Sequence, residues 1–335
     1  MEKEEVKVSV IMLAYNIGRY VETAIKGVLS QQTKYRVQLV IGEDCSTDNT
    51  LGICQRYAEQ YPEAITLVHH NPNYGLQRNT MDCYKYCKGQ YIAICDGDDY
   101  WTDKHKLQKM TDFMDSHTDF SECFHRVINY YEGKGIKSLS NGKGFNKVVS
   151  DVADLSKSCY ITNSSCLFRK YYEELPKWLE EISLCDYAIH MLNAERGKIY
   201  YFSKPMAVYR KHSAGIFSEM QSDKQLNMTL HVRELLMEHF KDNETVFNNL
   251  RKAATNIVFS LIRYYKLHDN KSKESETYQR ILRFYPGLTV DNIKKMEQED
   301  LLNRQKQGKS LKHLFMKFMS MGRAAVSFFI PLPRV

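Results

Sequence analysis

The first hundred residues alternate short apolar segments with longer amphipathic ones, and this alternation restricts the fold more than any other feature of the chain. The short segments are rich in β-branched residues, as buried strands are, and they cover residues 6–15, 36–44, 64–70 and 90–98. The segments between them space their apolar residues as one face of a helix does. Because strands that alternate with helices form βαβ units, the sequence predicts an α/β fold: Rossmann-like, with a mostly parallel central sheet flanked by helices.

The middle of the chain is expected to complete this sheet. A helix should follow Trp101, and the Gly, Ser and Lys content of residues 133–147 predicts a loop, either a plain surface loop or a lid. Short strands are expected over residues 164–169 and 198–212.

After residue 215 the pattern is helical throughout. Its most regular apolar stripe runs from Val246 to Tyr265, and such a stripe predicts helix packing rather than a cofactor site. A chain of 335 residues suits one large domain or two moderate ones. We therefore expect a boundary near residue 216, between a ligand-binding domain over 1–215 and a helical C-terminal region over 216–335.

Charge and cysteine content restrict the partners and the compartment. The net charge of +7, from 47 Lys and Arg against 40 Asp and Glu, is too diffuse to indicate nucleic acid as a partner. Nine Cys, an odd number without the spacing of a disulfide framework, suggest reduced thiols. The N-terminal segment has neither a signal-peptide cleavage site nor the length to span a bilayer, so a cytoplasmic location is expected.

Three carboxylates, Asp96, Asp98 and Asp99, follow directly on the fourth predicted strand. The other predicted strands also lead into polar residues: Asn16, Glu43, Asp44 and Asn71. Because parallel strands end at one edge of a sheet, beside helix N-termini, these groups should gather where such sheets bind ligands.

Three interpretations fit the three carboxylates. A solvated acidic turn is the simplest, since Asp and Gly are common in turns. A helix-loop-helix calcium site fails, because Trp101 occupies the position, counted from Asp96, where that loop needs glycine. A divalent metal that serves a nucleotide diphosphate needs only one or two protein carboxylates, and the position at a strand end favours this third interpretation.

Other ligand motifs are weak. Residues 308–310 read Gly-Lys-Ser, but Asn303 replaces the first glycine of a phosphate-binding loop, and the first strand leads into NIGRY rather than G-x-G-x-x-G. Cys83 and Cys87 lie one helical turn apart without a second pair to complete a zinc site, so core packing is expected for them.

Taken together, four segments carry a resemblance to a known family. VSVIMLAYN, IGEDCSTDNT, NYGLQRN and ICDGDDYW, in this order and spacing, resemble the family-2 glycosyltransferases, which have the GT-A fold. The resemblance covers roughly residues 6–215, and it is strongest to bacterial enzymes that add hexoses to capsule, O-antigen or other cell-surface glycans.

The resemblance implies a nucleotide site built from the first three of these segments. Ala14, Tyr15 and Asp44 match the residues that hold uridine, and Arg78 matches the arginine beside the base and diphosphate. A carboxylate can accept the uracil N–H, and an aromatic ring can cover the base. Cys45 departs from the family pattern, which has the more freely rotating glycine at this position.

The resemblance also implies a metal site and a catalytic base. Asp96 would contact the ribose, Asp98 would hold Mn²⁺ or Mg²⁺ with Asp99 in support, and His212 could join the metal or the diphosphate. Asp186 matches the second member of the acidic pair of the family, which is the base. The first member of that pair is replaced by Cys185.

These implied roles describe an inverting transferase. It would move a hexose of the glucose, galactose or N-acetylhexosamine type from a UDP-sugar to a glycan or a lipid-linked saccharide. The metal would neutralise charge on the leaving diphosphate while the base takes the proton of the acceptor. A non-catalytic UDP-sugar-binding protein, which Cys185 makes conceivable, and a metal-dependent nucleotidyltransferase stay open as alternatives.

Two features allow more than one role. Residues 309–335 combine an apolar helical face with Lys and Arg, so this segment could lie in an anionic membrane interface near a lipid-linked acceptor, or pack against the preceding helices or a second subunit. Trp101 could line the sugar pocket or pack in the core.

Overall fold

The computed structural model describes residues 5–141, 147–182, 186–212, 222–303 and 306. The chain divides into two compact units, one that ends at Ile257 and one that begins at Val258. The boundary expected near residue 216 falls among residues that the structure does not describe, and it stays a prediction.

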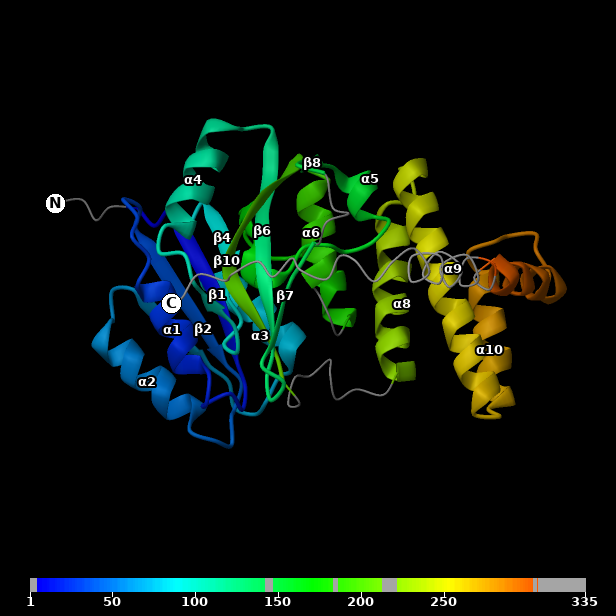
Figure 1. Ribbon diagram of the computed structural model, residues 1–335, viewed down its shortest axis with the longest axis horizontal. Helices are drawn as coiled ribbons and strands as arrows, with labels where there is room; N and C mark the ends of the chain where they lie inside the picture. Colours follow the sequence, from blue (N-terminus) through cyan, green and yellow to red (C-terminus); the bar gives the residue numbers. More distant parts are fainter. Residues whose placement is uncertain (1–4, 142–146, 183–185, 213–221, 304–305, 307–335) are drawn as a thin grey trace, which may run out of the picture. The chain divides into compact units, whose positions relative to one another are not determined.

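A ten-stranded sheet in the first unit has the order β3-β2-β1-β4-β9-β6-β10-β5, with β7 beside β6 and β8 beside β10 (Figure 1). Its first four members are mutually parallel, as the alternating pattern predicts. They are β1 (Val8–Ala14), β2 (Val37–Glu43), β3 (Ile65–His69) and β4 (Tyr91–Ile94). Each lies inside a predicted strand, so their carboxyl ends share one edge of the sheet.

The other strands make the sheet mixed. β9 lies antiparallel between β4 and β6, whereas β6 and β10 are parallel to each other. An irregularity interrupts the β6–β10 register between Phe202 and Ala207. These strands are β5 (Tyr100–Trp101), β6 (Phe120–Tyr131), β7 (Ile136–Leu139), β8 (Val149–Ser150), β9 (Leu167–Arg169) and β10 (Lys198–Lys211). The loop predicted over 133–147 is therefore wrong for the four residues of β7, which pair with β6.

Helices cover the sheet. α1 (Val21–Leu29), α2 (Thr50–Gln60) and α4 (Lys106–Ser116) share one apolar core with alternate residues of β1. α3 (Leu76–Tyr86) packs on β1 and β2, where Gly42 allows close approach: a Cβ there would lie 2.0 Å from Asn79 Oδ1. α5 (Val152–Leu155) and α6 (Asp186–Ala194) follow, and α6 contacts β6.

The C-terminal region is helical, as predicted. It contains α8 (Ser222–His239), α9 (Glu244–Leu267) and α10 (Lys271–Leu282). The stripe expected to pack is buried at Val246, Leu250, Ala254, Val258, Leu261, Ile262 and Tyr265. Among the described residues, no helix combines the length and the apolar character needed to cross a membrane. The segment over 309–335 lies outside the described residues.

Candidate active site

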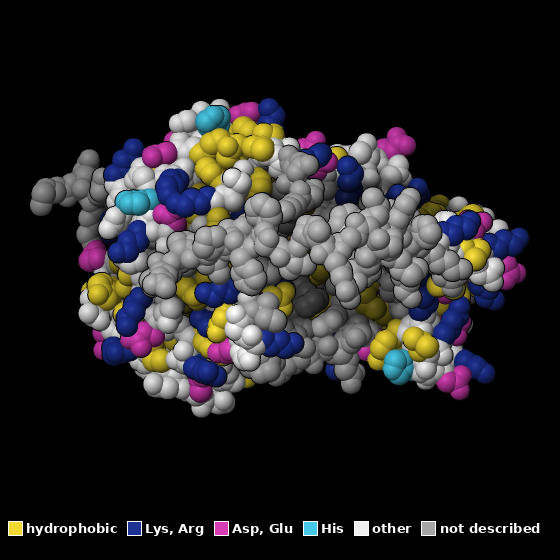
Figure 2. Space-filling view, in the orientation of Figure 1, with side chains coloured by type: hydrophobic (Ala, Val, Ile, Leu, Met, Phe, Trp, Pro, Cys, Tyr) yellow, Lys and Arg dark blue, Asp and Glu magenta, His cyan; other side chains and the backbone are white. Residues whose placement is uncertain are grey.

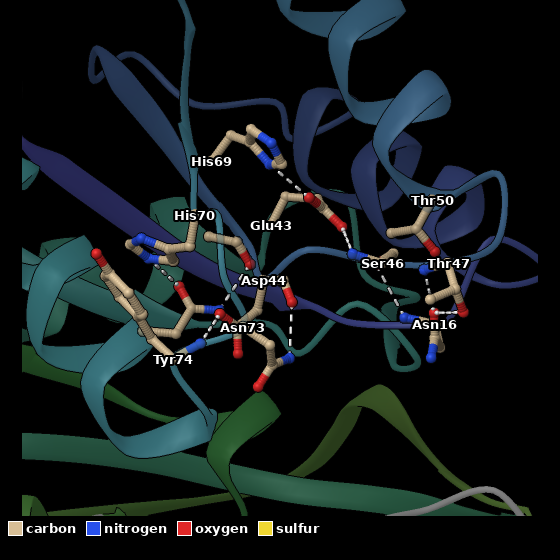
Figure 3. A network of polar contacts seen from close by, with 12 residues as sticks. Asn16, Glu43, Asp44, Ser46, Thr47, Thr50, His69, His70, Asn73 and Tyr74 are labelled. Carbon is tan, nitrogen blue, oxygen red and sulfur yellow. Dashed lines mark hydrogen bonds and ion pairs between the residues drawn. The ribbon is translucent and has the colours of Figure 1, made fainter.

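The loops after β1 and β2 are tied together by hydrogen bonds between their polar side chains and backbone amides (Figure 3). The Asn16 amide donates to Ser46 Oγ at 3.0 Å, and Asn16 Oδ1 accepts from the Thr47 amide at 2.8 Å. Asn16 and Cys45 both have positive φ, 52° and 59°. Both loops thus turn sharply at the strand ends, so that their backbones lie side by side.

The buried carboxylates of Glu43 and Asp44 bind the loops at this edge of the sheet. Glu43 is fully buried, and its carboxylate accepts from the Ser46 amide and lies 2.8 Å from His69 Nδ1. Asp44 is 2% exposed, and its two oxygens accept from the amides of Tyr74 and Gly75 at 2.7 and 2.8 Å. In this structure Asp44 therefore holds the turn before α3, and its contact with uracil stays a prediction.

The other residues expected to bind nucleotide lie at the end of β1 and in or near the turn before α3. The Arg78 guanidinium lies 4.3 Å from the centroid of the Tyr74 ring, and the Tyr15 side chain is 43% exposed. The Ala14 side chain is buried and its carbonyl accepts from the Asp44 amide, so Ala14 shapes the loop from its backbone. An exposed cation and exposed aromatic rings thus lie in the segments that follow β1 and β3.

The acidic turn after β4 is held by the end of β10. The Arg210 amide donates to Asp99 Oδ1, and Arg210 Nε donates to the carbonyl of Asp98, both at 2.8 Å. His212 Nε2 lies 3.0 Å from Asp98 Oδ2, which brings together the two residues predicted to bind metal. Asp98 keeps 28% of its side chain exposed, whereas His212 keeps only 4%.

Asp186 approaches the same acidic turn from a distant part of the sequence. Burial, then the charge of Asp98, then the charge of Asp186 raise the pKa of Asp96 to about 7, and a hydrogen bond from Asn163 opposes this rise. Asp186 begins α6, where its Oδ1 accepts from the Tyr187 amide at 2.7 Å. Asp96 is therefore influenced by both the predicted metal ligand and the predicted base. Cys185 lies outside the described residues.

The chemistry of these side chains fits a divalent cation. A carboxylate oxygen of Asp98 and an imidazole nitrogen of His212 face each other at ligand spacing, and both suit Mn²⁺. Asp99 Oδ2 is buried and has no hydrogen-bond partner within the described part of the chain. Burial and the charges of Asp98 and Asp96 raise the pKa of Asp99 well above its ordinary value. A cation would relieve this accumulation of negative charge.

Three further residues considered as possible ligand contacts are buried: Trp101, Cys83 and Cys87. Trp101 is 5% exposed, and its Nε1 donates to the carbonyl of Ser164 at 3.0 Å, so it packs in the core rather than lining a pocket. Cys83 and Cys87 are buried in α3 and at its end, as core packing predicts.

Sequence reasoning missed Arg210 and two buried charged residues outside the acidic turn, Lys106 and Glu122. Arg210 was assigned no role, although its place two residues before His212, on the same side of an extended strand, could have indicated one. Lys106 is buried beneath Trp101, and burial lowers its pKa to about 8. Glu122, fully buried on β6, lies in a segment whose polar residues hide the strand pattern.

Two curated relatives share part of this sequence. The uncharacterized protein Rv1520 of Mycobacterium tuberculosis is 32% identical over 219 residues, which are 65% of this chain and 62% of that protein. The match thus spans less than two thirds of the relative. The putative teichuronic acid biosynthesis glycosyltransferase TuaG of Bacillus subtilis is 37% identical over 107 residues, 32% of this chain and 41% of that protein.

Solved structures share the fold, and a family model matches the sequence. TarS 1–349 from S. aureus, in complex with UDP-GlcNAc, has a TM-score of 0.54 at 17% identity, covering 84% of this chain and 91% of that one. The mannosyltransferase PcManGT from Pyrobaculum calidifontis, in complex with GDP-Man and Mn²⁺, has a TM-score of 0.56 at 13% identity, covering 90% and 81%. These likenesses confirm the predicted GT-A fold. The model of glycosyl transferase family 2 matches residues 9–176, half of the chain, and the chain therefore belongs to glycosyl transferase family 2.

Proposed function

We propose that the protein is an inverting, metal-dependent glycosyltransferase that moves a hexose from a UDP-sugar to a saccharide or lipid-linked saccharide. One observation carries this proposal: His212 Nε2, just after β10, lies 3.0 Å from Asp98 Oδ2, in the acidic turn after β4. Two candidate metal ligands from distant parts of the sequence thus meet at the strand ends, where a nucleotide diphosphate would have to be held for transfer to a second bound substrate.

Donor binding would use the strand ends. Asp98 and His212 would hold Mn²⁺ or Mg²⁺, and a bound divalent cation neutralises the charge that develops on a leaving diphosphate. Arg78, with its guanidinium over Tyr74, would border the base and the diphosphate, and Tyr15 would cover the uracil. Asp96 would accept a hydrogen bond from the ribose.

Acceptor activation would use Asp186. Its carboxylate stands at the N-terminus of α6, where one oxygen accepts from the Tyr187 amide and the other can take a proton. Attack by the acceptor hydroxyl on the side of the anomeric carbon opposite the diphosphate would invert that centre. A single base suffices, because the leaving diphosphate needs no proton from a second carboxylic acid.

The ligands and names of similar proteins support a nucleotide-sugar donor and a polysaccharide acceptor for this chain, but they do not identify the particular sugar. TarS was solved with UDP-GlcNAc and PcManGT with GDP-Man and Mn²⁺, and TuaG is named for teichuronic acid biosynthesis. We therefore infer a UDP-hexose of the glucose, galactose or N-acetylhexosamine type and an acceptor in cell-surface polysaccharide synthesis. The enzyme would work in the cytoplasm at the inner face of the membrane, held there by residues 309–335.

The test is UDP release from a panel of UDP-hexoses, with and without Mn²⁺, for the full chain and three variants. Asp186→Asn should lower kcat by about 10²–10⁴-fold while donor binding persists. Asp98→Asn should abolish the stimulation by Mn²⁺. Asp119→Asn removes an exposed carboxylate bonded to Lys198 and should change neither.

Two results would contradict the proposal. Donor binding without turnover across a broad acceptor panel would indicate a binding protein. Release of pyrophosphate from a nucleoside triphosphate would indicate a nucleotidyltransferase.

A further inference from the structure

Three side chains of metal-ligating types form a buried cluster where α6 meets the sheet. They are Glu122 of β6, Cys166, which directly precedes β9, and His190 of α6, and all three are fully buried. One ligand atom from each lies within 4.8 Å of the ligand atoms of the other two. The proposed transfer reaction gives none of them a role.

The pairing of β6 with β9 explains why Glu122 and Cys166 face the same way. Glu122 stands opposite Phe168 in this antiparallel pair. Cys166 has an extended backbone two positions before Phe168, and residues two positions apart point to one face of a sheet. α6 contacts β6 (Figure 1), and it brings His190 to Glu122 on that face. Three segments that are distant in the sequence thus meet at one buried point.

Hydrogen bonds within the described part of the chain do not satisfy Glu122 and His190. His190 Nδ1 lies 2.6 Å from Glu122 Oε1, which is ion-pair distance, yet the contact is not aligned as a hydrogen bond. Both carboxylate oxygens and both ring nitrogens lack a hydrogen-bond partner among the described residues. Because a buried carboxylate is destabilising unless a positive charge and polar contacts compensate it, these atoms indicate a bound cation.

We propose that Glu122, Cys166 and His190 bind a zinc ion that joins α6 to β6 and β9. A carboxylate oxygen, an imidazole nitrogen and a thiolate sulfur are the donor types that zinc takes in proteins, and water would complete the fourth position. The sulfur selects zinc over Mg²⁺ and Mn²⁺, which prefer oxygen ligands. This site would therefore differ in its metal from the acidic turn.

The geometry needs one small adjustment to hold the ion. Two ligands of a tetrahedral zinc ion lie about 3.3 Å apart, so the atoms of Glu122 and His190 that lie 2.6 Å apart would have to separate. Rotation of the Glu122 carboxylate supplies a movement of this size without a shift of the backbone.

The charges of the cluster match those of zinc. Burial, with the charge of Glu122, raises the pKa of Cys166 well above its ordinary value, so the metal-free thiol is neutral and donates to the Asn163 carbonyl at 3.1 Å. Zinc would release that proton to solvent, because a coordinated thiol is deprotonated. The carboxylate and the thiolate would then cancel the two positive charges of the ion and leave a neutral buried site.

A metal-free ion pair is the competing explanation. It accounts for the contact between Glu122 and His190, but it leaves the second oxygen of the carboxylate and the second nitrogen of the ring without partners among the described residues. A zinc ion accounts for the convergence of all three side chains. The inference does not depend on the proposed function, because it involves neither substrate nor turnover.

The first test measures metal content. The full chain is dialysed against zinc, desalted and examined by elemental analysis, and we expect about one zinc per wild-type chain and a small fraction of that in Cys166→Ala. Cys123→Ala is the matched control. Cys123 is also fully buried and adjoins Glu122 in β6, but it points to the opposite face of the sheet, so this variant should keep its zinc.

Asp98→Asn distinguishes the buried site from the acidic turn, and it should leave the zinc content unchanged. Two results would overturn the proposal. One is a wild type without zinc, which would leave the cluster as an ion pair. The other is zinc that is kept in Cys166→Ala or lost in Asp98→Asn, which would assign the ion to another place.

The second test uses the wild type alone and decides the question if Cys166→Ala does not fold, as circular dichroism would show. Zinc is removed with a chelator and replaced by cobalt(II), which gives a charge-transfer band in the near ultraviolet when a thiolate binds it. We expect this band to appear and then to disappear when zinc is added back, because zinc binds such sites more tightly than cobalt does. Cobalt that binds without the band would have no sulfur ligand and would overturn the proposal. Zinc binding in a chain that turns over no donor would contradict the proposed function alone.

Discussion

Cys45 illustrates at the residue scale how the sequence can indicate strain. It stands where the family pattern has glycine, and its φ of 59° lies in the left-handed region. A side chain in that region costs about 1 kcal/mol, so Cys45→Gly should raise the free energy of unfolding by up to about that amount. Urea unfolding measures the difference.

The control for this prediction is Cys45→Ala, which removes the thiol but keeps a Cβ. It should leave the free energy of unfolding nearly unchanged. An equal gain in both variants would mean that the sulfur, rather than the backbone, is the source of the strain.

The lowered pKa of Asp103 predicts how the free energy of unfolding depends on pH. Partial burial favours its neutral form, but hydrogen bonds from Lys109, the His105 amide and Lys204 outweigh this and lower the pKa of Asp103 to about 2. Because the folded-state pKa lies below the ordinary 3.8, the stabilisation is present above pH 4 and is lost as the pH falls toward 2.

Asp103→Asn should therefore cost roughly 2 kcal/mol at pH 5 and much less at pH 2. Thermal unfolding across this range measures the effect. Asp82→Asn, which breaks an Asp–Lys pair of 2.9 Å on α3, should cost little at either pH. A constant penalty for Asp103→Asn would show that its hydrogen bonds do not depend on its charge.

The candidate site was predictable where residues stand in ordered motifs. Asp98 and His212 were both expected at the metal site, and the structure brings them within 3.0 Å. Glu122 and His190 were not expected, because a buried ion pair leaves no periodic signal and its partners are far apart in the sequence. The roles of all these residues stay predictions until they are measured.

At the scale of elements, β1 to β4 were predictable because each is a short, mostly apolar segment that alternates with a helical pattern. β6 was missed, although it is the longest neighbour of β10, because Glu122, His125 and Arg126 interrupt its apolar pattern. Two of these residues meet partners on other elements: Glu122 Oε1 lies 2.6 Å from His190 Nδ1 of α6, and Arg126 Nε donates to Tyr201 Oη of β10 at 2.9 Å. The pattern of apolar and polar residues along one strand does not indicate which side chains of other elements will contact it.

The acidic turn that follows β4 packs against the end of β1 at Gly97, whose amide donates to the Leu13 carbonyl at 3.0 Å. A Cβ at this position would lie 2.9 Å from the Leu13 carbonyl oxygen and 2.3 Å from Ile17 Cδ1. Gly97→Ala should therefore push the turn away from β1 and lower Mn²⁺-dependent donor turnover at least tenfold, a loss of about 1.4 kcal/mol or more.

Gly52→Ala is the matched control. Its Cβ, within α2, would meet only the side chain of Asn49, which can move. Donor turnover should persist in this variant. Wild-type turnover in Gly97→Ala would show that the acidic turn tolerates displacement.

At the scale of the whole molecule, the distribution of charge can be followed on one face. On the face drawn in Figure 2, Lys and Arg are interspersed with Asp and Glu. Residues 309–335, which lie outside the described residues, are the candidate for membrane contact because of their composition.

A chain that ends at residue 308 should lose binding to vesicles that contain anionic lipid, while its release of UDP in solution is retained. Cosedimentation measures the binding. Undiminished binding would assign the membrane contact to another part of the molecule, and loss of UDP release would mean that the segment packs on the protein.

The irregularity between Phe202 and Ala207 sets which side chain meets Asp98. Beyond it, consecutive residues of the extended chain point to opposite faces, so inserting one residue there would bring Lys211 to the place that His212 now takes. An ammonium group would then stand where an imidazole stands now, and charge compensation by lysine would replace ligation. Under the proposed mechanism, the length of this interruption in β10 would decide whether a metal or a lysine neutralises the diphosphate, and relatives that differ there should differ in their need for Mn²⁺.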